Sequence, residues 1–446
     1  MDIERLIVGC LQKKEVDNLK LISVKIEGFR NIDSAEIRFD HLTSLVSLNS
    51  YGKSNLMKAI DFAVDFIKKD KEEKDRMMSW TAGLPLNKKI DSKNFMAEFM
   101  FSYMMDKKEY YVNYGFEFIW IKNHDAGKEI VREWLNVKEN EKSQKYSKLI
   151  SRDGVGTYRT SVTGRCTNVL NIDQNELMVN KLLLNESLYY YDILRQLNEI
   201  KVYVDRHLDA SEWYSRNSLI IRKNADEFDL DEVESIPRVI FFLKQKYKEK
   251  YELLKDVFCQ LFPNIMSIDV REIDLGKNSS VRFSGDIPYV ISNKVYSMYV
   301  QDRTLNQPIA FTNLSDGAKR IFLMLTYTIL ADISGITLIA FEEPENSVHP
   351  SLLQSYLNIL SQLAKDCKII IASHSPYIIQ YVNAESLYIG KPNDHGLADF
   401  AKIDNRKINQ LLKDASDSNE SIGSYIFDLL SGGDDEIGIL LDYLEK

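Results

Sequence analysis

Three consecutive residues, Gly52-Lys53-Ser54, have the side chains needed to hold a nucleoside triphosphate. Glycine lets backbone N–H groups close around phosphate oxygens, lysine supplies a mobile cation, and the serine hydroxyl can bind magnesium. An apolar, β-prone run over residues 43–48 precedes them, and apolar residues at helical spacing follow over residues 56–67. A strand, a short turn and a helix N-terminus in this order predict a phosphate-binding P-loop.

The pattern G-x-x-x-x-G-K-[ST] has one departure, because Ser47 stands where the first glycine is expected. An ordinary strand-to-helix turn is the alternative to a P-loop. Other residues that could act on a triphosphate are therefore needed to decide between a P-loop and an ordinary turn.

Two acids, Glu342 and Glu343, follow an apolar run over residues 335–341 that suits a central parallel strand. Carboxylates at a strand end beside a P-loop have two roles: one holds the magnesium shell, and the other orients and deprotonates the attacking water. Adjacent acids at the end of a buried strand are costly without a cation or another partner. His374 ends the next buried strand, residues 368–372, where it would either bind a γ-phosphate or its water, or be structural.

A helix is expected to begin after Ser315, which suits the N-cap position, and Gly317 in its first turn allows close approach of another backbone. Its continuation over residues 321–331 is apolar nearly all round and should be buried. The start of this helix is either an ordinary capped helix of the core or a second anion site.

The elements that must position these residues are read from hydrophobic spacing. The alternating runs 95–103, 109–121 and 129–137 predict an antiparallel sheet with one wet face. Residues 140–164 are polar and glycine-punctuated, which favours an irregular segment. Further helices are expected over residues 3–11, 177–208, 239–261, 353–364 and 422–430, and further strands over residues 22–27, 35–39, 266–273, 280–283, 294–301 and 387–389.

Net charge, cysteine spacing and the length of apolar runs exclude several classes of protein. The formal charge of −9 over 446 residues argues against a general nucleic-acid coat, and the mixed-sign run 68–76 reads as solvated helix surface. The four cysteines show no paired spacing, which predicts neither disulfides nor a zinc site. No signal peptide and no apolar run of about 20 residues is evident, so we expect a cytoplasmic location without a membrane span.

Four motifs follow one another along the chain: the P-loop, Leu314-Ser-Asp-Gly317, a strand that ends in Glu-Glu, and a strand that ends in Ser-His-Ser-Pro. This order resembles that of the ABC-type ATPase heads of the SMC, RecF and overcoming-lysogenization-defect group. The stretch Ile26-Glu-Gly-Phe-Arg-Asn-Ile is similar to that group's first hairpin. The chain looks most like stand-alone ATPases of bacterial abortive-infection and anti-phage systems. The resemblance implies an α/β P-loop NTPase with an antiparallel β subdomain and an inserted helical and β arm.

On this basis four segments are expected. Residues 1–205 form a lobe with the P-loop and the antiparallel sheet, 206–304 the arm, 305–410 the C-terminal ATPase lobe, and 411–446 a helical tail. The remainder after His374 is shorter than the domain of roughly 100 residues that a nuclease of this group carries there. We therefore expect any cleavage of nucleic acid to be left to another protein.

The resemblance also assigns roles to matching residues. Glu343 would be the catalytic base, His374 the switch histidine, and Ser54 and Glu342 the magnesium ligands. Ser315 and Gly317 would cap the γ-phosphate of a nucleotide held by a second protomer, and residues 345–349 would lie near the dimer seam. The residues implied to bind nucleotide are Asn49, Ser50, Tyr51, Gly52, Lys53, Ser54, Asn55, Arg30, Ser315 and Gly317.

Two further departures from the group's pattern concern chemistry: Glu342 replaces an aspartate, and Asp316 stands at a glycine position. The longer side chain of Glu342 is expected to affect the rate of ATP hydrolysis more than ATP binding. The implied function is an ATPase that uses ATP and Mg²⁺, forms a homodimer or higher oligomer around ATP, and controls a separately encoded effector protein. The alternatives are a nucleotide-gated scaffold with negligible turnover, and a RecF-like DNA-repair clamp, for which DNA is the partner.

Overall fold

We describe the protein from a computed structural model. The residues that the structure describes are 19–49, 51–85, 87–105, 107–122, 129–141, 143–205, 214, 220–222, 235–276, 289–291, 293–364, 367–391 and 395–445. Contacts divide the chain into two compact units. The P-loop unit comprises Glu15–Val204, Thr337–Phe341 and Lys368–Lys446. The other unit comprises Met1–Lys14, Asp205–Ile336 and Glu342–Cys367, and we call it the signature unit after its motif Leu314-Ser-Asp-Gly317. The four-segment division expected from the sequence stays a prediction.

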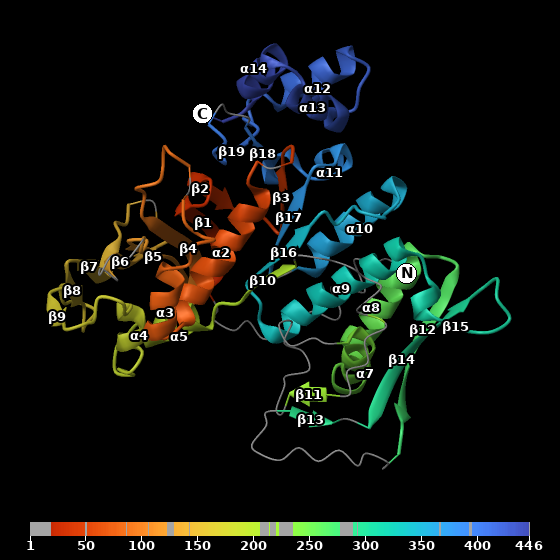
Figure 1. Ribbon diagram of the computed structural model, residues 1–446, viewed down its shortest axis with the longest axis horizontal. Coiled ribbons are helices and arrows are strands. Elements are labelled where there is room, and N and C mark those ends of the chain that lie inside the picture. Colours follow the sequence, from red (N-terminus) through yellow and green to blue (C-terminus); the bar gives the residue numbers. More distant parts are fainter. Residues whose placement is uncertain are drawn as a thin grey trace. The chain divides into compact units, whose positions relative to one another are not determined.

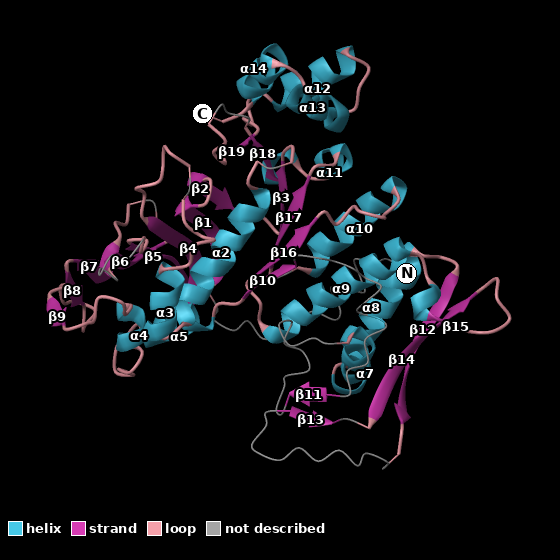
Figure 2. Cartoon of the chain, in the orientation of Figure 1, coloured by secondary structure: helices cyan, strands magenta, loops and turns pink. Residues whose placement is uncertain are grey.

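An antiparallel sheet forms one layer of the P-loop unit, with strand order β2-β1-β4-β5-β6-β7-β8-β9 (Figure 2). Its strands are β1 (Lys20–Phe29), β2 (Ile32–Arg38), β4 (Phe95–Met105), β5 (Lys108–Phe118), β6 (Ile130–Glu139), β7 (Ser147–Asp153), β8 (Val155–Tyr158) and β9 (Asn168–Leu170). The three strands predicted over residues 95–137 and their antiparallel pairing are confirmed. The irregular segment predicted over residues 140–164 is wrong, since β7 and β8 continue the sheet there, and cross-strand pairing outweighs their polar composition.

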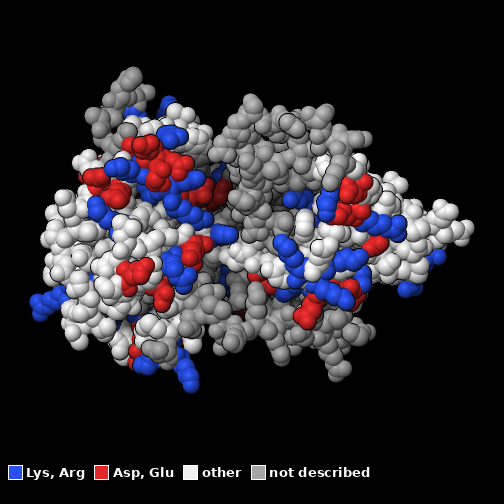
Figure 3. Space-filling model, turned by 90° about the horizontal axis from the view of Figure 1, so that it is seen from below, with Lys and Arg blue, Asp and Glu red and all other residues white. Residues whose placement is uncertain are grey.

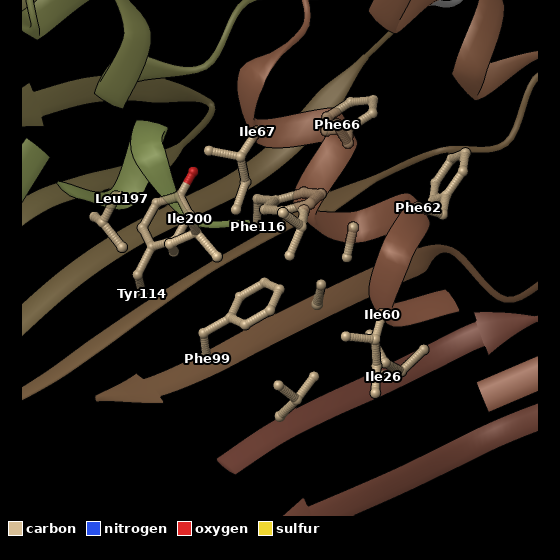
Figure 4. Packing of buried hydrophobic residues seen from close by; sticks show 14 of the residues in the cluster. Ile26, Ile60, Phe62, Phe66, Ile67, Phe99, Tyr114, Phe116, Leu197 and Ile200 are labelled. Atoms are coloured by element: carbon tan, nitrogen blue, oxygen red, sulfur yellow. The ribbon is translucent and has the colours of Figure 1, made fainter. Parts of the chain in front are cut away.

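Helix α2 (Lys53–Lys68) packs its apolar face against this sheet. Phe66 stacks on Phe116 and Phe118 of β5, with ring centroids 5.0 and 4.8 Å apart. Figure 4 shows Ile60 and Ile67 from the same helix directed toward the same cluster of buried side chains. Burial of this aromatic and aliphatic surface, worth about 25 cal/mol per Å², fixes the helix that starts at Lys53.

A second sheet of the P-loop unit, which we call the central sheet, has the order β10-β16-β17-β3-β18-β19. Its strands are β10 (Val202–Asp205), β16 (Leu338–Glu342), β17 (Lys368–Ser373), β3 (Leu42–Val46), β18 (Leu387–Gly390) and β19 (Phe400–Lys402). Strand β3 runs parallel to both β17 and β18. The N–H of Lys368 donates to the carbonyl of Thr337 at 2.9 Å, so β17 and β16 begin at one edge and end at the other.

The single helix predicted over residues 177–208 is partly wrong, and residues 206–208 lie outside the described residues. The structure has two short helices, α4 (Met178–Leu182) and α5 (Tyr191–Glu199), and residues 202–205 then form β10. The segment Val-Tyr-Val is β-prone, and pairing with the central sheet satisfies its backbone groups better than an extra helical turn would.

In the signature unit, α7 (Ile236–Lys246) and α8 (Lys248–Leu261) replace the one helix expected over residues 239–261, with a break at Tyr247. Strands β12 (Ile265–Asp274), β14 (Lys294–Asp302) and β15 (Ile309–Ala310) form a sheet, and β11 (Ile220–Arg222) pairs with β13 (Tyr289–Ile291). The strand expected over residues 280–283 and the helix expected over 3–11 lie outside the described residues.

Helix α9 (Asp316–Ser334) has side chains buried on all sides, as predicted, and α10 (Pro350–Leu363) begins at the expected proline. The remaining helical elements are α3 (Lys71–Met78), η2 (Phe311–Asn313), α11 (Pro376–Tyr381), η3 (Ala384–Ser386), α12 (Ile408–Asp417), α13 (Ile422–Ser431) and α14 (Asp434–Tyr443) (Figure 1). A search of the described helices for one long and apolar enough to cross a membrane found none.

The mixed-sign run 68–76 covers the end of α2 and most of α3, and it is solvated as expected except at Lys74, which is 1% exposed. Lys69 pairs with Glu73 at 3.7 Å, and Lys71 with Asp173 at 3.1 Å. Basic and acidic side chains are interspersed on the molecular face in Figure 3. Exposed pairs of this kind contribute at most about 1 kcal/mol each.

Candidate nucleotide site

Glycine is required at the end of the turn between β3 and α2, which the structure describes apart from Ser50. Gly52 is the N-cap of α2 and adopts a left-handed conformation with φ of 98°. A Cβ atom built there would lie 2.6 Å from the Cβ of Ala398 and 3.1 Å from the Oδ1 of Asn31. Both the backbone conformation and the space therefore require glycine at this position.

The ammonium group of Lys53 is directed into this turn. Its Nζ donates to the carbonyl of Ser47 at 2.8 Å, to the Oγ of Ser47 at 3.1 Å and to the carbonyl of Leu48 at 3.1 Å. Only 9% of the residue is exposed. The cation required by the P-loop prediction is thus held among the oxygens of the loop, at the start of α2, where the helix dipole also favours an anion.

Ser47, the departure from the glycine pattern, is accommodated by a glycine on the neighbouring strand. Ile389 of β18 pairs with Val46 of β3, so Gly390 follows beside Ser47. A Cβ on Gly390 would lie 2.6 Å from the Cβ of Ser47 and 3.2 Å from its Oγ. The side chain that Ser47 adds occupies the space that Gly390 leaves.

Arg30 is connected to the P-loop helix through hydrogen bonds. Its Nη1 donates to the Oδ1 of Asn55 at 2.8 Å, and the Nδ2 of Asn55 donates to the Oδ1 of Asn31 at 2.8 Å. The Arg30 guanidinium also lies 5.8 Å from the ring centre of Trp80. The turn between β1 and β2 therefore places a cation next to Asn55, the residue that follows Ser54.

The end of β17 lies against the same turn. The N–H of Ser47 contacts the carbonyl of Ser373 at 3.4 Å, and the Oγ of Ser373 accepts from the N–H of Ser375 at 2.9 Å. His374 stands between these two serines and is partly exposed. The predicted switch histidine thus follows a residue bonded to the P-loop.

The two acids stand where β16 ends. The Oε1 of Glu342 is buried and has no hydrogen-bond partner among the residues that the structure describes. Glu343 has a left-handed backbone with φ of 47°, and its Oε2 accepts from the Nδ2 of Asn346 at 2.8 Å. A buried carboxylate oxygen without a donor is costly, and it suits a residue whose partner is a cation.

These residues fit Mg²⁺ in the manner of a P-loop enzyme. No cluster of three or more histidine, cysteine, aspartate or glutamate residues occurs in the described parts of the chain. Mg²⁺ in nucleotide sites is commonly held by one or two protein groups together with phosphates and water. The carboxylate of Glu342 has the chemistry for this role, and so has the hydroxyl of Ser54.

The start of α9 in the signature unit has the predicted cap. The Oγ of Ser315 accepts from the N–H of Ala318 at 3.3 Å, and Ser315 itself is exposed. A Cβ on Gly317 would lie 2.1 Å from the carbonyl oxygen of Ser347. The expected close approach of a backbone to Gly317 is confirmed, and the approaching segment is the one that follows the two acids.

Asp316, the second departure, is exposed and pairs with the buried ammonium of Lys319 at 2.8 Å. The next residue, Arg320, was not singled out from the sequence. Its Nη2 donates to the carbonyls of Glu342 and Glu343 at 3.0 and 2.7 Å. Burial lowers the pKa of this guanidinium from its usual range. The sequence feature that could have identified Arg320 is its place beside Lys319, since these two cations begin an otherwise apolar helix.

The structure thus brings the predicted residues together in two groups. The P-loop unit holds Arg30, Asn49, Tyr51, Gly52, Lys53, Ser54, Asn55 and His374, and the signature unit holds Ser315, Gly317, Glu342 and Glu343. Ser50 lies outside the described residues. Four contributors were missed by sequence reasoning: Asn31, Arg320, Asn346 and Gly390.

Three comparisons relate the chain to known proteins. A family model described as "AAA ATPase domain" matches residues 19–379. Protein ea59 of Escherichia phage lambda is 43% identical over 63 residues, which are 14% of this chain and only 12% of that protein.

Solved structures of SMC heads are also similar, each at 11% identity. The SmcHead bound to the C-winged helix domain of ScpA has a TM-score of 0.44, covering 88% of this chain and 99% of that one. The SMC head domain from Thermotoga maritima has a TM-score of 0.42, with 86% and 99% covered. The family match extends over most of the chain and includes the P-loop, the paired acids and His374. The protein is therefore an α/β P-loop NTPase that belongs to the AAA ATPase domain family.

Proposed function

We propose that the protein binds and hydrolyses ATP in the cytoplasm, and that two copies dimerise around the nucleotide to control a partner effector. The observation that carries the proposal is the P-loop turn, where Gly52 has a left-handed backbone and the Nζ of Lys53 is directed among the loop oxygens. The family match supports nucleotide binding by this loop.

In this proposal Lys53 and the N–H groups at the start of α2 bind the phosphates, and Arg30 lies close to the nucleotide. Asn49, Ser50, Tyr51 and Asn55 would also bind the nucleotide. Ser54 and Glu342 would hold Mg²⁺, which neutralises charge on the phosphates when bound. Strands β3, β17 and β16 are neighbours in one sheet, and they end at the same edge of it.

Glu343 would act as the general base that orients and deprotonates the attacking water, with His374 donating to the γ-phosphate or to that water. The hydrogen bond from Asn346 orients the Glu343 carboxylate. Ser315 and Gly317 of a second copy would complete the site, because the exposed N-terminus of α9 is suited to a γ-phosphate. Each charge-assisted hydrogen bond gained there contributes about 1.5–3 kcal/mol, enough to bias a dimer between two states.

The partner is proposed to be an effector protein encoded nearby, and the setting to be anti-phage defence. The motif order supports this, since it resembles that of stand-alone ATPases of defence systems. The competing function is a nucleotide-gated scaffold with negligible turnover. The glutamate at position 342 favours it, because the side chain is one methylene longer than the aspartate of the group.

Phosphate release from MgATP by the wild type and by Glu343→Gln separates the two functions. Loss of a general base lowers kcat by about 10²–10⁴-fold, while ATP affinity should change little because the P-loop is intact. Wild-type turnover at the level of Glu343→Gln would instead establish the scaffold.

Lys53→Ala should weaken ATP binding by about 10²-fold or more, since at least two charge-assisted hydrogen bonds are lost. A calorimetric or fluorescence titration measures this, with Lys58→Ala on the same helix as the matched control. Unchanged affinity in Lys53→Ala would refute the P-loop assignment.

A further inference from the structure

The guanidinium of Arg320 connects the signature helix to the backbone of both acids. Arg320 lies near the start of α9, five residues after Ser315, and its Nη2 reaches the carbonyls of Glu342 and Glu343. These contacts, at 3.0 and 2.7 Å, are made to main-chain atoms. They therefore control the position of the backbone from which the predicted base projects.

The backbone at Glu343 needs such support. A non-glycine residue with φ of 47° is strained, at a cost of about 1–2 kcal/mol, and persists only where its surroundings fix it. The carbonyl of Glu343 accepts from the N–H of Asn346 at 3.1 Å as well as from Arg320. Pro344, which follows, has no N–H to offer the strand ladder. Arg320 supplies a side-chain donor to both carbonyls.

A second contact holds the same two segments together. Gly317, one turn before Arg320, lies so close to the carbonyl of Ser347 that a Cβ would be 2.1 Å away. The first turns of α9 and the segment 342–347 are thus joined at two points, one by van der Waals contact and one by hydrogen bonds. Movement of the α9 N-terminus would be transmitted to Glu343.

We propose that Arg320 is a positioning residue for hydrolysis: it fixes the left-handed backbone at Glu343, and thereby the carboxylate of the base, relative to the signature helix. The inference rests on the proposed function, because it gives Arg320 a role only if Glu343 acts on water. Through Arg320, the α9 N-terminus, which would cap the nucleotide held by a second copy, is linked to Glu343, which would act on the nucleotide of its own chain.

The test compares Arg320→Met and Arg320→Lys with Arg303→Met, a matched control at an exposed arginine of the same unit. A base displaced by about 1 Å loses on the order of 10²-fold in rate. We expect Arg320→Met to lower kcat by about 10- to 100-fold, with the KM for ATP and the ATP dissociation constant within about threefold of wild type. The kcat of Arg320→Lys should lie between those of Arg320→Met and the wild type, because an ammonium retains the charge but not the planar fork of the guanidinium.

The double variant Arg320→Met/Glu343→Gln distinguishes positioning from general stability. If Arg320 acts through Glu343, the double variant is no slower than Glu343→Gln alone, since residues that act as one unit are not additive. A merely structural arginine would lower the rate in both backgrounds by the same factor and would also weaken ATP binding.

Additive losses, a raised KM with unchanged kcat, or full activity in Arg320→Met would each overturn the inference while leaving the ATPase proposal intact. A wild type no faster than Glu343→Gln would overturn both proposals. Retained ATP binding by Arg320→Met and Arg320→Lys, measured without turnover, shows that the variants are folded.

Discussion

At the scale of single residues, the hydroxyl of Ser47 is part of the P-loop. It accepts a hydrogen bond from Lys53 at 3.1 Å and donates one to the carbonyl of Leu48 at 3.0 Å. A glycine here would remove this acceptor of the Lys53 ammonium group. The substitution that departs from the motif therefore adds an oxygen to the set that holds the cation, and Gly390 makes the space for it.

This pairing gives a prediction for Gly390→Ala. The added methyl group would lie 2.6 Å from the Cβ of Ser47, and overpacking of this kind costs about 1–3 kcal/mol. We expect a lower unfolding midpoint and weaker ATP binding, both measured on the purified chain. Adding Ser47→Gly to the same variant removes the clash and should restore most of the midpoint. Equal midpoints for the single and double variants would contradict the pairing.

At the scale of secondary-structure elements, a buried carboxylate on β6 caps a helix. Glu133 is 1% exposed, and its oxygens accept from the N–H groups of Met178 and Val179 at 2.6 and 3.0 Å. These N–H groups open α4 and have no partner within the helix. Burial raises the pKa of Glu133 to about 7, against the favourable effects of the two N–H groups and Arg152.

The raised pKa of Glu133 predicts how stability depends on pH. The unfolded chain releases this proton near pH 4.5 and the folded chain near pH 7, so the folded state binds more protons between these values. The contribution of Glu133 to stability is therefore complete below pH 4.5 and is lost as the pH rises to about 7.

Glu133→Gln removes this titration. Relative to the variant, the wild type should gain on the order of 1–3 kcal/mol of unfolding free energy as the pH falls from 8 to 5. Urea unfolding of both proteins across this range measures the difference. Parallel stability profiles would show that Glu133 keeps the same charge throughout.

At the scale of the whole molecule, neighbouring strands of the central sheet come from distant parts of the chain. Strand β3, which leads into the P-loop, lies between β17 and β18, and β16 lies beyond β17. The carboxyl ends of such strands meet at one edge, which is where open α/β sheets bind ligands. Completion of the site by a second copy remains the proposal, through the exposed N-terminus of α9.

Ser315→Arg tests that proposal. A long cation on this exposed N-cap should block ATP-driven dimerisation, because it occupies the space of the incoming γ-phosphate, while each chain still binds ATP. Sedimentation with and without ATP measures the effect. Ser421→Arg is the matched control, since Ser421 also caps a helix, accepting from the N–H of Ser424 at 3.1 Å. Loss of either cap costs about 1 kcal/mol. Dimerisation of Ser315→Arg to the wild-type extent would refute the role of Ser315.

The sequence by itself determined the features that depend on near neighbours. Gly52-Lys53-Ser54 after an apolar run, the N-cap at Ser315 and the strands that end at Glu342 and Ser373 follow from residue type and spacing. Each is set within about one helical turn or one strand, which is the range over which periodicity and capping act.

Only the tertiary structure decided which residues that are distant in the sequence come into contact. It made residues 202–205 a strand of the central sheet rather than the end of a helix, and it placed Gly390 beside Ser47. It also directed Arg320 to the carbonyls of Glu342 and Glu343. These outcomes depend on strand pairing and on burial against distant segments, whose free energies outweigh local preference and leave no periodic pattern in the sequence.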